Sequence, residues 1–351
     1  MRRGLIAWSK AELPEAALAA RVARAQVVMG QAGLAALLCY SNNTRPAAAS
    51  YLCGFVPYWS EGVMLLPREG SPYLVVALSK RVATWIEATS RVARVISTGR
   101  FGAEAAKAIA AAGGGTVGVA DLDNFPAGIA SDMRGAGATL ADATALFAEL
   151  RAAADPAELA LGARAAAIAH AALARISGAE ADTGAAIAAV EDHARVSGAE
   201  ECYVSAAPDL AHDRRLLRIE GRVALGASYA IRATVAYKGT WVRLARTLVR
   251  DPARADLPRK AAERFAAAVA SLPDTAGFAG MTSWLIEGCR IAQPLEPLAG
   301  ARLATPHALE PGRLVTVQAT LEIDGVPIVL AAPALIGAAG APAALLVPPV
   351  F

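Results

Sequence analysis

Short apolar runs alternate with Ala-rich helical segments through the first 150 residues, and this alternation restricts the possible fold more than any other feature. Apolar residues recur at helical spacing over 11–33, and Gly33 ends the run. Two further segments are expected to be helical, at 79–88 and before the glycines at 113–115. Strands are predicted at 34–40, 61–67, 72–78, 92–96 and 116–120, the second and third forming a hairpin. This order predicts an α/β domain over residues 1–151.

A boundary follows at residues 152–156, where Asp155 can cap a helix that has Pro156 in its first turn. The remainder, 152–351, is predicted to be a second domain that runs helix, helix, strands and then repeats that order. Its helices are expected at 155–176, 183–197, 257–271 and 280–288. Its strands are expected at 201–206, 223–237, 240–249, 313–323 and 326–336. The whole chain is therefore predicted to be an α+β protein of two domains.

Composition excludes several classes of protein. Hydrophobic residues make up 55% of the chain but aromatic residues only 5%, so much of the apolar content is alanine. No apolar window of about 18 residues runs without a charge, Pro or Gly, and no membrane span is predicted. The net charge of +3 is too balanced to indicate nucleic-acid binding. The four cysteines form no CxxC pair, and the basic start has too short an apolar run for a signal peptide, so a cytoplasmic protein is expected.

Six segments in the right order carry a resemblance to the creatinase, aminopeptidase P and prolidase family, which has the pita-bread fold. The apolar run 34–38 with Tyr51-Leu52-Cys53-Gly54-Phe55 is similar to the family's first strand and "YLtGf" loop. The others are 151–159, 205–212, 226–248, 288–297 and 309–328, which are similar to "R..K...Ei", "SGxNxxxxH", "GD.v.iD.g..y.GY..D.tRT", "GHGiG..vHE.p" and "L.pGMvftvEP…Gvriedt". The resemblance implies a creatinase-type N-terminal domain before a pita-bread domain.

The resemblance also implies where two metal ions would be bound, because most members hold them with two Asp, one His and two Glu. The matching positions here are Arg232, Arg243, Cys289, Gln318 and, less securely, Val329. Not one ligand is kept, and a guanidinium repels a cation and cannot ligate it. A metal-independent protein with no cofactor is therefore expected.

Creatinase itself uses no metal, so the loss does not exclude catalysis. In creatinase a histidine of the "SGxNxxxxH" loop moves protons, and His212 matches it. An imidazole suits acid–base work near neutral pH. The two carboxylates that hold creatine are not matched, since Ala245 and the region of Val329 stand at their positions. Creatine is therefore a poor candidate substrate.

Arg232 and Arg243 lie on predicted strands, and two interpretations remain open. Both can form a clamp for a carboxylate or phosphate, which Arg binds through its two-pronged guanidinium. Alternatively, they turn outward or pair with protein acids such as Glu287, Glu296 or Glu322. Burying two guanidinium groups without a counter-charge is costly, so some anion should meet them.

The remaining candidates have weaker support. Cys289 is either a nucleophile or a small buried replacement for the family His. Glu296 falls where many members keep a second His, and Gln318 keeps the shape of the lost Glu. Tyr58 and Trp59 are the aromatic candidates for contact with substrate, because in creatinase-like homodimers one N-terminal domain reaches the partner's site.

Two functions from different classes follow. The first is a creatinase-like hydrolase or lyase that acts on a C–N bond of a small anionic substrate, with His212, Cys289 and Glu296 as catalytic candidates. The second is an inactive pita-bread protein that binds a ligand or a protein partner. The sequence gives neither the substrate nor the presence of turnover.

Overall fold

A computed structural model describes residues 10–56, 60–111, 113–291, 293–338 and 340–351. The chain divides into two compact units. Of the described residues, the N-terminal unit holds 10–157 together with Cys289–Pro294, and the C-terminal unit holds Glu158–Gly288 and Leu295–Phe351. In the part of the chain that the structure describes, no helix is both long and apolar enough to cross a membrane.

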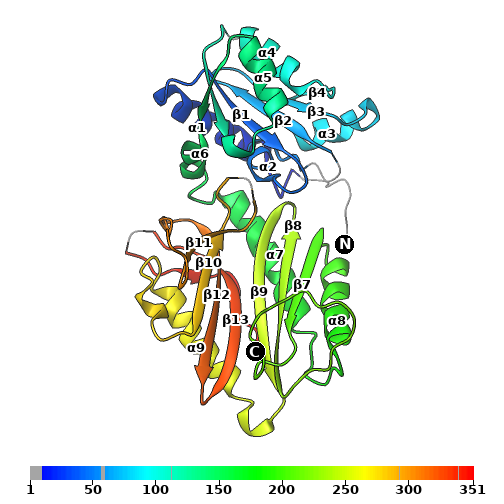
Figure 1. Cartoon of the computed structure of the whole chain (residues 1–351), viewed down its shortest axis with the longest axis vertical. Helices are drawn as coiled ribbons and strands as arrows, with labels where there is room; N and C mark the ends of the chain where they lie inside the picture. Colours follow the sequence, from blue (N-terminus) through cyan, green and yellow to red (C-terminus); the bar gives the residue numbers. More distant parts are fainter. Residues whose placement is uncertain (1–9, 57–59, 112, 292, 339) are drawn as a thin grey trace. The chain divides into compact units, whose positions relative to one another are not determined.

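The N-terminal unit is built on a six-stranded sheet in the order β4-β3-β2-β1-β5-β6 (Figure 1). The strands are β1 (Ala36–Ser41), β2 (Gly62–Pro67), β3 (Tyr73–Val76), β4 (Arg94–Ser97), β5 (Thr116–Ala120) and β6 (Thr139–Asp142). The helices are α1 (Glu15–Gln31), α2 (Ala47–Cys53), α3 (Ala83–Thr89), α4 (Phe101–Ala111), α5 (Ala127–Gly135) and α6 (Thr144–Leu150). β2 and β3 pair antiparallel, which confirms the predicted hairpin.

Both faces of the central strands β1, β2 and β5 are buried, which explains why these strands are largely apolar, whereas the edge strands β4 and β6 are partly exposed. On one face Leu37 and Cys39 of β1 pack with residues of α1 and α2. On the other face Leu38 packs with residues of α4 and α5. The alternation along β1 therefore joins two apolar layers into one domain of the predicted α/β class.

The C-terminal unit is built on an eight-stranded sheet in which the strands follow the order β11-β10-β12-β13-β9-β8-β7, with β14 paired to β13. The strands are β7 (Glu201–Ala207), β8 (Ser228–Tyr237), β9 (Thr240–Val249), β10 (Ser283–Gly288), β11 (Glu296–Gly300), β12 (Leu314–Ile323), β13 (Val326–Leu335) and β14 (Ala344–Leu345). The helices are α7 (Pro156–Leu173), α8 (Thr183–Val196) and α9 (Leu257–Ala270).

The two faces of this sheet differ. Residues of α7 and α8 pack on β7, β8 and β9 in one apolar cluster, and residues of α9 pack on β10, β12 and β13 in another. Side chains of the opposite parity form the other face, which we call the open face. Ser205 of β7, Arg232 of β8 and Arg243 of β9 belong to it, because the residues next to them in each strand belong to the helix-side cluster.

Two expectations about local structure are wrong. Residues 280–288 are not a helix, because Ser283–Gly288 forms β10 between β11 and β12. The segment is too short to show a clear period, and Trp and Ile favour a strand once neighbours are present. Residues 51–53 are not in a loop, since they end helix α2 before Gly54, whose φ of 75° ends the helix.

Candidate functional site

A network of polar side chains crosses the open face of the C-terminal sheet. Arg232 lies in one cross-strand row with Ala245 of β9, Ala331 of β13 and Gln318 of β12. Although Gln318 is three strands away, its Oε1 accepts a hydrogen bond of 3.0 Å from Nη1 of Arg232. Because both residues between them are buried alanines, the Arg232 side chain has room to reach across the sheet.

Arg232 has only neutral hydrogen-bond acceptors among the described residues. Besides Gln318, Ser205 accepts from its Nη2 at 3.3 Å, while Nε is buried and has no hydrogen-bond partner. Burial lowers the pKa of this guanidinium to about 10, the charge of Arg243 adds to the effect and Glu287 opposes it. A lowered pKa means that the surroundings disfavour the positive charge.

The positive charge of Arg243 is balanced by a carboxylate. Its Nη1 forms an ion pair with Oε2 of Glu287 on β10, and its Nε donates to the Thr234 hydroxyl at 3.1 Å. The side chains of Arg243 and Glu287 are only 18% and 9% exposed. The expectation that an acid would meet the guanidiniums therefore holds for Arg243 with Glu287. Glu322, another acid considered, pairs instead with Arg214.

The charges of this network do not balance. The network contains two guanidinium groups and one carboxylate, and only Arg243 contacts that carboxylate. Arg232, Arg243 and Glu287 together therefore carry about one positive charge. Both arginines lie on the open face, as their strand positions imply. The arrangement suits an anion near Arg232. A guanidinium whose protein partners are neutral can donate two parallel hydrogen bonds to a carboxylate or phosphate.

His212 lies in the segment that follows β7. Its Nδ1 is 2.8 Å from Oδ2 of Asp209, and its side chain is 84% exposed. In the same segment Leu210 is buried and Leu216 partly buried, and both pack with apolar residues such as Val329. Among the described residues no hydrogen bond or ion pair joins His212 to Arg232 or Arg243, so the structure does not bring the predicted base and clamp together.

Cys289 follows β10 directly, and Glu296 is the first residue of β11. Cys289 belongs to the N-terminal unit, where its Sγ accepts from Nη1 of Arg151 at 2.7 Å and donates to the Gln293 carbonyl at 3.3 Å. Glu296 begins β11 opposite Gly288 in the C-terminal unit. Tyr58 and Trp59 lie outside the described residues.

Sequence reasoning missed two members of the network, Ser205 and Thr234. Both are polar residues in largely apolar strands, and both fall on the same two-residue alternation as the neighbouring arginines. That alternation is the signal that could have found them. It places Arg232 opposite Ser205, and Thr234 opposite both Tyr203 and Arg243.

The metal ions that the family resemblance implies do not fit these residues. At the matching positions Arg232, Arg243 and Gln318 supply two cations and a neutral amide, and Val329 has no donor side chain. Within the described ranges no three His, Cys, Asp or Glu side chains gather so that they could hold an ion. Divalent cations are held by carboxylate or carbonyl oxygens, imidazole nitrogens or thiolates. Among the matching positions only Cys289 and the Gln318 amide carry such a donor, and the two guanidiniums repel a cation.

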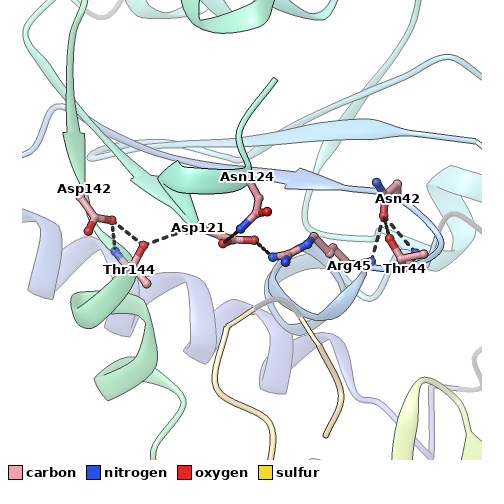
Figure 2. A network of polar contacts seen from close by, with 7 residues as sticks. All are labelled: Asn42, Thr44, Arg45, Asp121, Asn124, Asp142 and Thr144. Atoms are coloured by element: carbon pink, nitrogen blue, oxygen red, sulfur yellow. Dashed lines mark hydrogen bonds and ion pairs between the residues drawn. The ribbon is translucent and has the colours of Figure 1, made fainter. Parts of the chain in front are cut away.

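A second polar cluster lies at the carboxyl ends of the parallel strands β1, β5 and β6 (Figure 2). Asp121 pairs with Arg45 and accepts from Asn124 Nδ2 at 2.8 Å, and its backbone N–H donates to the Thr144 hydroxyl at 3.0 Å. Asp142 in turn accepts from the Thr144 backbone N–H at 2.9 Å. Because these groups bond one another, we assign them to holding three loops together.

Three comparisons with known proteins bear on these findings. Residues 21–153 match the family model of the creatinase/prolidase N-terminal domain. A search of curated protein sequences finds no match. Solved structures are similar over nearly the whole chain.

An X-Pro aminopeptidase from Thermotoga maritima superposes with a TM-score of 0.72 at 16% identity, covering 94% of this chain and 99% of that one. An Xaa-Pro dipeptidase from Bacillus anthracis gives 0.69 at 17% identity, with 94% and 97% covered. The prolidase from Pyrococcus horikoshii gives 0.69 at 16%, with 93% and 97% covered.

At identities this low, the structural similarity establishes the fold alone. The chemistry has to be argued from the residues of this chain. The chain therefore contains a creatinase/prolidase N-terminal domain and has the two-domain pita-bread fold over nearly its whole length, which confirms its resemblance to the creatinase, aminopeptidase P and prolidase family.

Proposed function

We propose that this chain is a metal-independent pita-bread protein that binds a small anionic ligand at Arg232. The observation that carries the proposal is a largely buried guanidinium whose acceptors, Gln318 and Ser205, are both neutral. A buried charge without a counter-charge destabilises the folded protein. A carboxylate or phosphate that binds there removes this penalty, so the ligand should be an anion.

The two arginines have different roles in this proposal. Arg243 is already paired with Glu287, so it links β9 to β10 across the sheet and supports a positive potential without offering a free charge. Arg232 supplies the charge that meets the ligand, and Gln318 fixes its orientation. The ligand clamp expected from the sequence is thereby reduced from two guanidiniums to one.

The test is calorimetric titration with acetate, benzoate and inorganic phosphate, preceded by a thermal-shift screen. The wild type should be stabilised by at least one of these anions, and Arg232→Gln should weaken its binding about tenfold or more, the loss expected for a charged hydrogen bond. Arg264→Gln is the matched control, because it removes the same charge from an exposed position on α9. Equal affinities for wild type and Arg232→Gln would refute anion binding at Arg232.

A second candidate function is hydrolysis of a C–N bond in the bound anion, and the Asp209–His212 contact favours it. A carboxylate on Nδ1 orients an imidazole and leaves Nε2 to move a proton. The similar structures carry the names of dipeptidases, a prolidase and an aminopeptidase. Cys289 and Glu296 stay catalytic candidates of this version only.

Turnover can be tested separately from binding. Wild type is incubated with X-Pro dipeptides and N-acylated amino acids, and products are followed by chromatography. In the catalytic version His212→Asn lowers kcat by about a hundredfold or more while anion affinity stays unchanged. Anion binding without any product favours the non-catalytic binder. Turnover that His212→Asn does not affect excludes His212 as the group that moves the proton.

Two further predictions from the sequence belong to the same proposal. The chain acts in the cytoplasm as a homodimer, in which Tyr58 and Trp59 of one copy contact the ligand of the other. Analytical ultracentrifugation tests the dimer. Trp59→Ala should then weaken binding of the anion that wild type binds.

A further inference from the structure

A groove in the C-terminal unit has no part in the network around Arg232. Its volume is about 480 Å³, and strands β10, β11 and β12 supply part of its wall. Leu285 lines it, and this residue pairs in register with Gln318, so the groove begins beside the Arg232 network on the same strands. The rest of the wall comes from residues 300–303 and from the segment after His212.

Three guanidinium groups line this groove, from two separate segments: Arg214, Arg215 and Arg302. Arg214 is 3.3 Å from Glu322, and both side chains are about half exposed. An exposed ion pair with a single contact contributes little, so Arg214 can turn to a ligand at small cost. Arg215 is held more firmly, because its Nε and Nη2 donate to both carboxylate oxygens of Asp213. Neither partner acid lines the groove.

Arg302 differs from the other two. It is exposed, and within the described ranges it has no hydrogen bond or ion pair. The groove therefore has one guanidinium without a partner (Arg302), one in a weak ion pair (Arg214) and one held by Asp213 (Arg215). No carboxylate side chain is among the residues that line it.

The rest of the lining indicates the kind of ligand. The hydroxyls of Ser283 and Thr320 lie 3.1 Å apart and can bond an oxygen atom. Leu285, Pro297 and Leu303 add apolar surface that suits a carbon frame. A volume of about 480 Å³ lies within the range of small-molecule sites.

We propose that this groove is a binding site for a small molecule that carries two or more carboxylate or phosphate groups on a short carbon frame. Arg302 binds one anionic group, and Arg214, from a separate segment of the chain, binds another. The site is separate from the one proposed at Arg232, because Arg232 does not line the groove.

The experiment uses the full-length chain carrying Arg232→Gln, so that only the groove can respond. This protein is titrated calorimetrically with tricarballylate, methylenediphosphonate and acetate. We expect binding of at least one multivalent anion, and at least tenfold weaker binding of acetate. The first two probes distinguish a carboxylate ligand from a phosphate-like one.

Adding Arg302→Gln should weaken binding of the multivalent anion about tenfold, the effect of losing one charged hydrogen bond. Adding Arg264→Gln, on the helix-covered side of the sheet, should leave it unchanged. Because Arg302 is exposed and unbonded, its replacement should not change the melting temperature. An unchanged melting temperature confirms that the variant is folded. Failure of both multivalent probes to bind overturns the groove site, as does equal weakening by Arg264→Gln, which would indicate attraction by net charge alone. Neither failure bears on Arg232.

Discussion

The two faces of the C-terminal sheet differ in the kind of side chain they carry, although the same strands supply both. The helix-covered face is a continuous apolar layer in which Ile231 of β8 and Leu244 of β9 are fully buried. The open face, one residue away along each strand, carries Arg232 and Arg243. Because alternate side chains point to opposite faces, the residues that build the fold and those that bind a ligand can change independently.

This difference has a consequence for how the chemistry of such a sheet can change. The covered face needs only apolar side chains of suitable volume, and many sequences satisfy that requirement. The charges of the open face can therefore differ, as they do at Arg232 and Arg243, while the packing of the covered face stays intact.

The largest effect is expected from breaking the ion pair between Arg243 and Glu287. Glu287→Gln leaves two guanidiniums on the open face without a carboxylate, and removing one partner of a buried pair costs about 3 kcal/mol or more. Urea unfolding, followed by circular dichroism, measures the loss. The same variant should bind anions more tightly than wild type, because the positive charge near Arg232 rises.

A double variant distinguishes the effect of an unpaired charge from the effect of changing side chains at these two positions. Replacing both residues, as in Arg243→Met with Glu287→Leu, removes both charges and should restore most of the lost stability. If the double variant is as unstable as Glu287→Gln alone, the polar face contributes to packing much as the covered face does. The contrast between the two faces would then fail.

A smaller effect is expected from Arg232→Met. Because Arg232 has no carboxylate partner, losing its charge also removes a desolvation penalty, and the free energy of unfolding should change by no more than about 1 kcal/mol. Arg246→Met, on the covered face, is the comparison. Arg246 bonds the carbonyls of Leu173, Ile176 and Phe351, and leaving them unsatisfied should cost about 2 kcal/mol. Urea unfolding of both variants tests the order, and a larger loss for Arg232→Met would contradict it.

The fold could be predicted from the sequence further than the site could. Apolar runs such as 34–40 and 326–336 indicated strands β1 and β13, because burial imposes a pattern on neighbouring residues. Residues 283–288 were predicted to be helical, since only their pairing with β11 and β12 shows that they are a strand.

The site depends on contacts between residues far apart in the chain, and no local pattern encodes them. Arg232 meets Gln318 across 86 positions of sequence, and Arg243 meets Glu287 across 44. The resemblance placed the two arginines and Gln318 at one site, but it did not show which arginine would be paired. It also did not show that His212 would be largely exposed.

We propose that the residues at this site exclude the divalent cations that the family resemblance implies. Equilibrium dialysis of the purified chain against Mn²⁺, followed by metal analysis of the retained protein, tests this directly. The account predicts no stoichiometric retention of Mn²⁺, because guanidiniums stand at two ligand positions. Two tightly held ions per chain would contradict it.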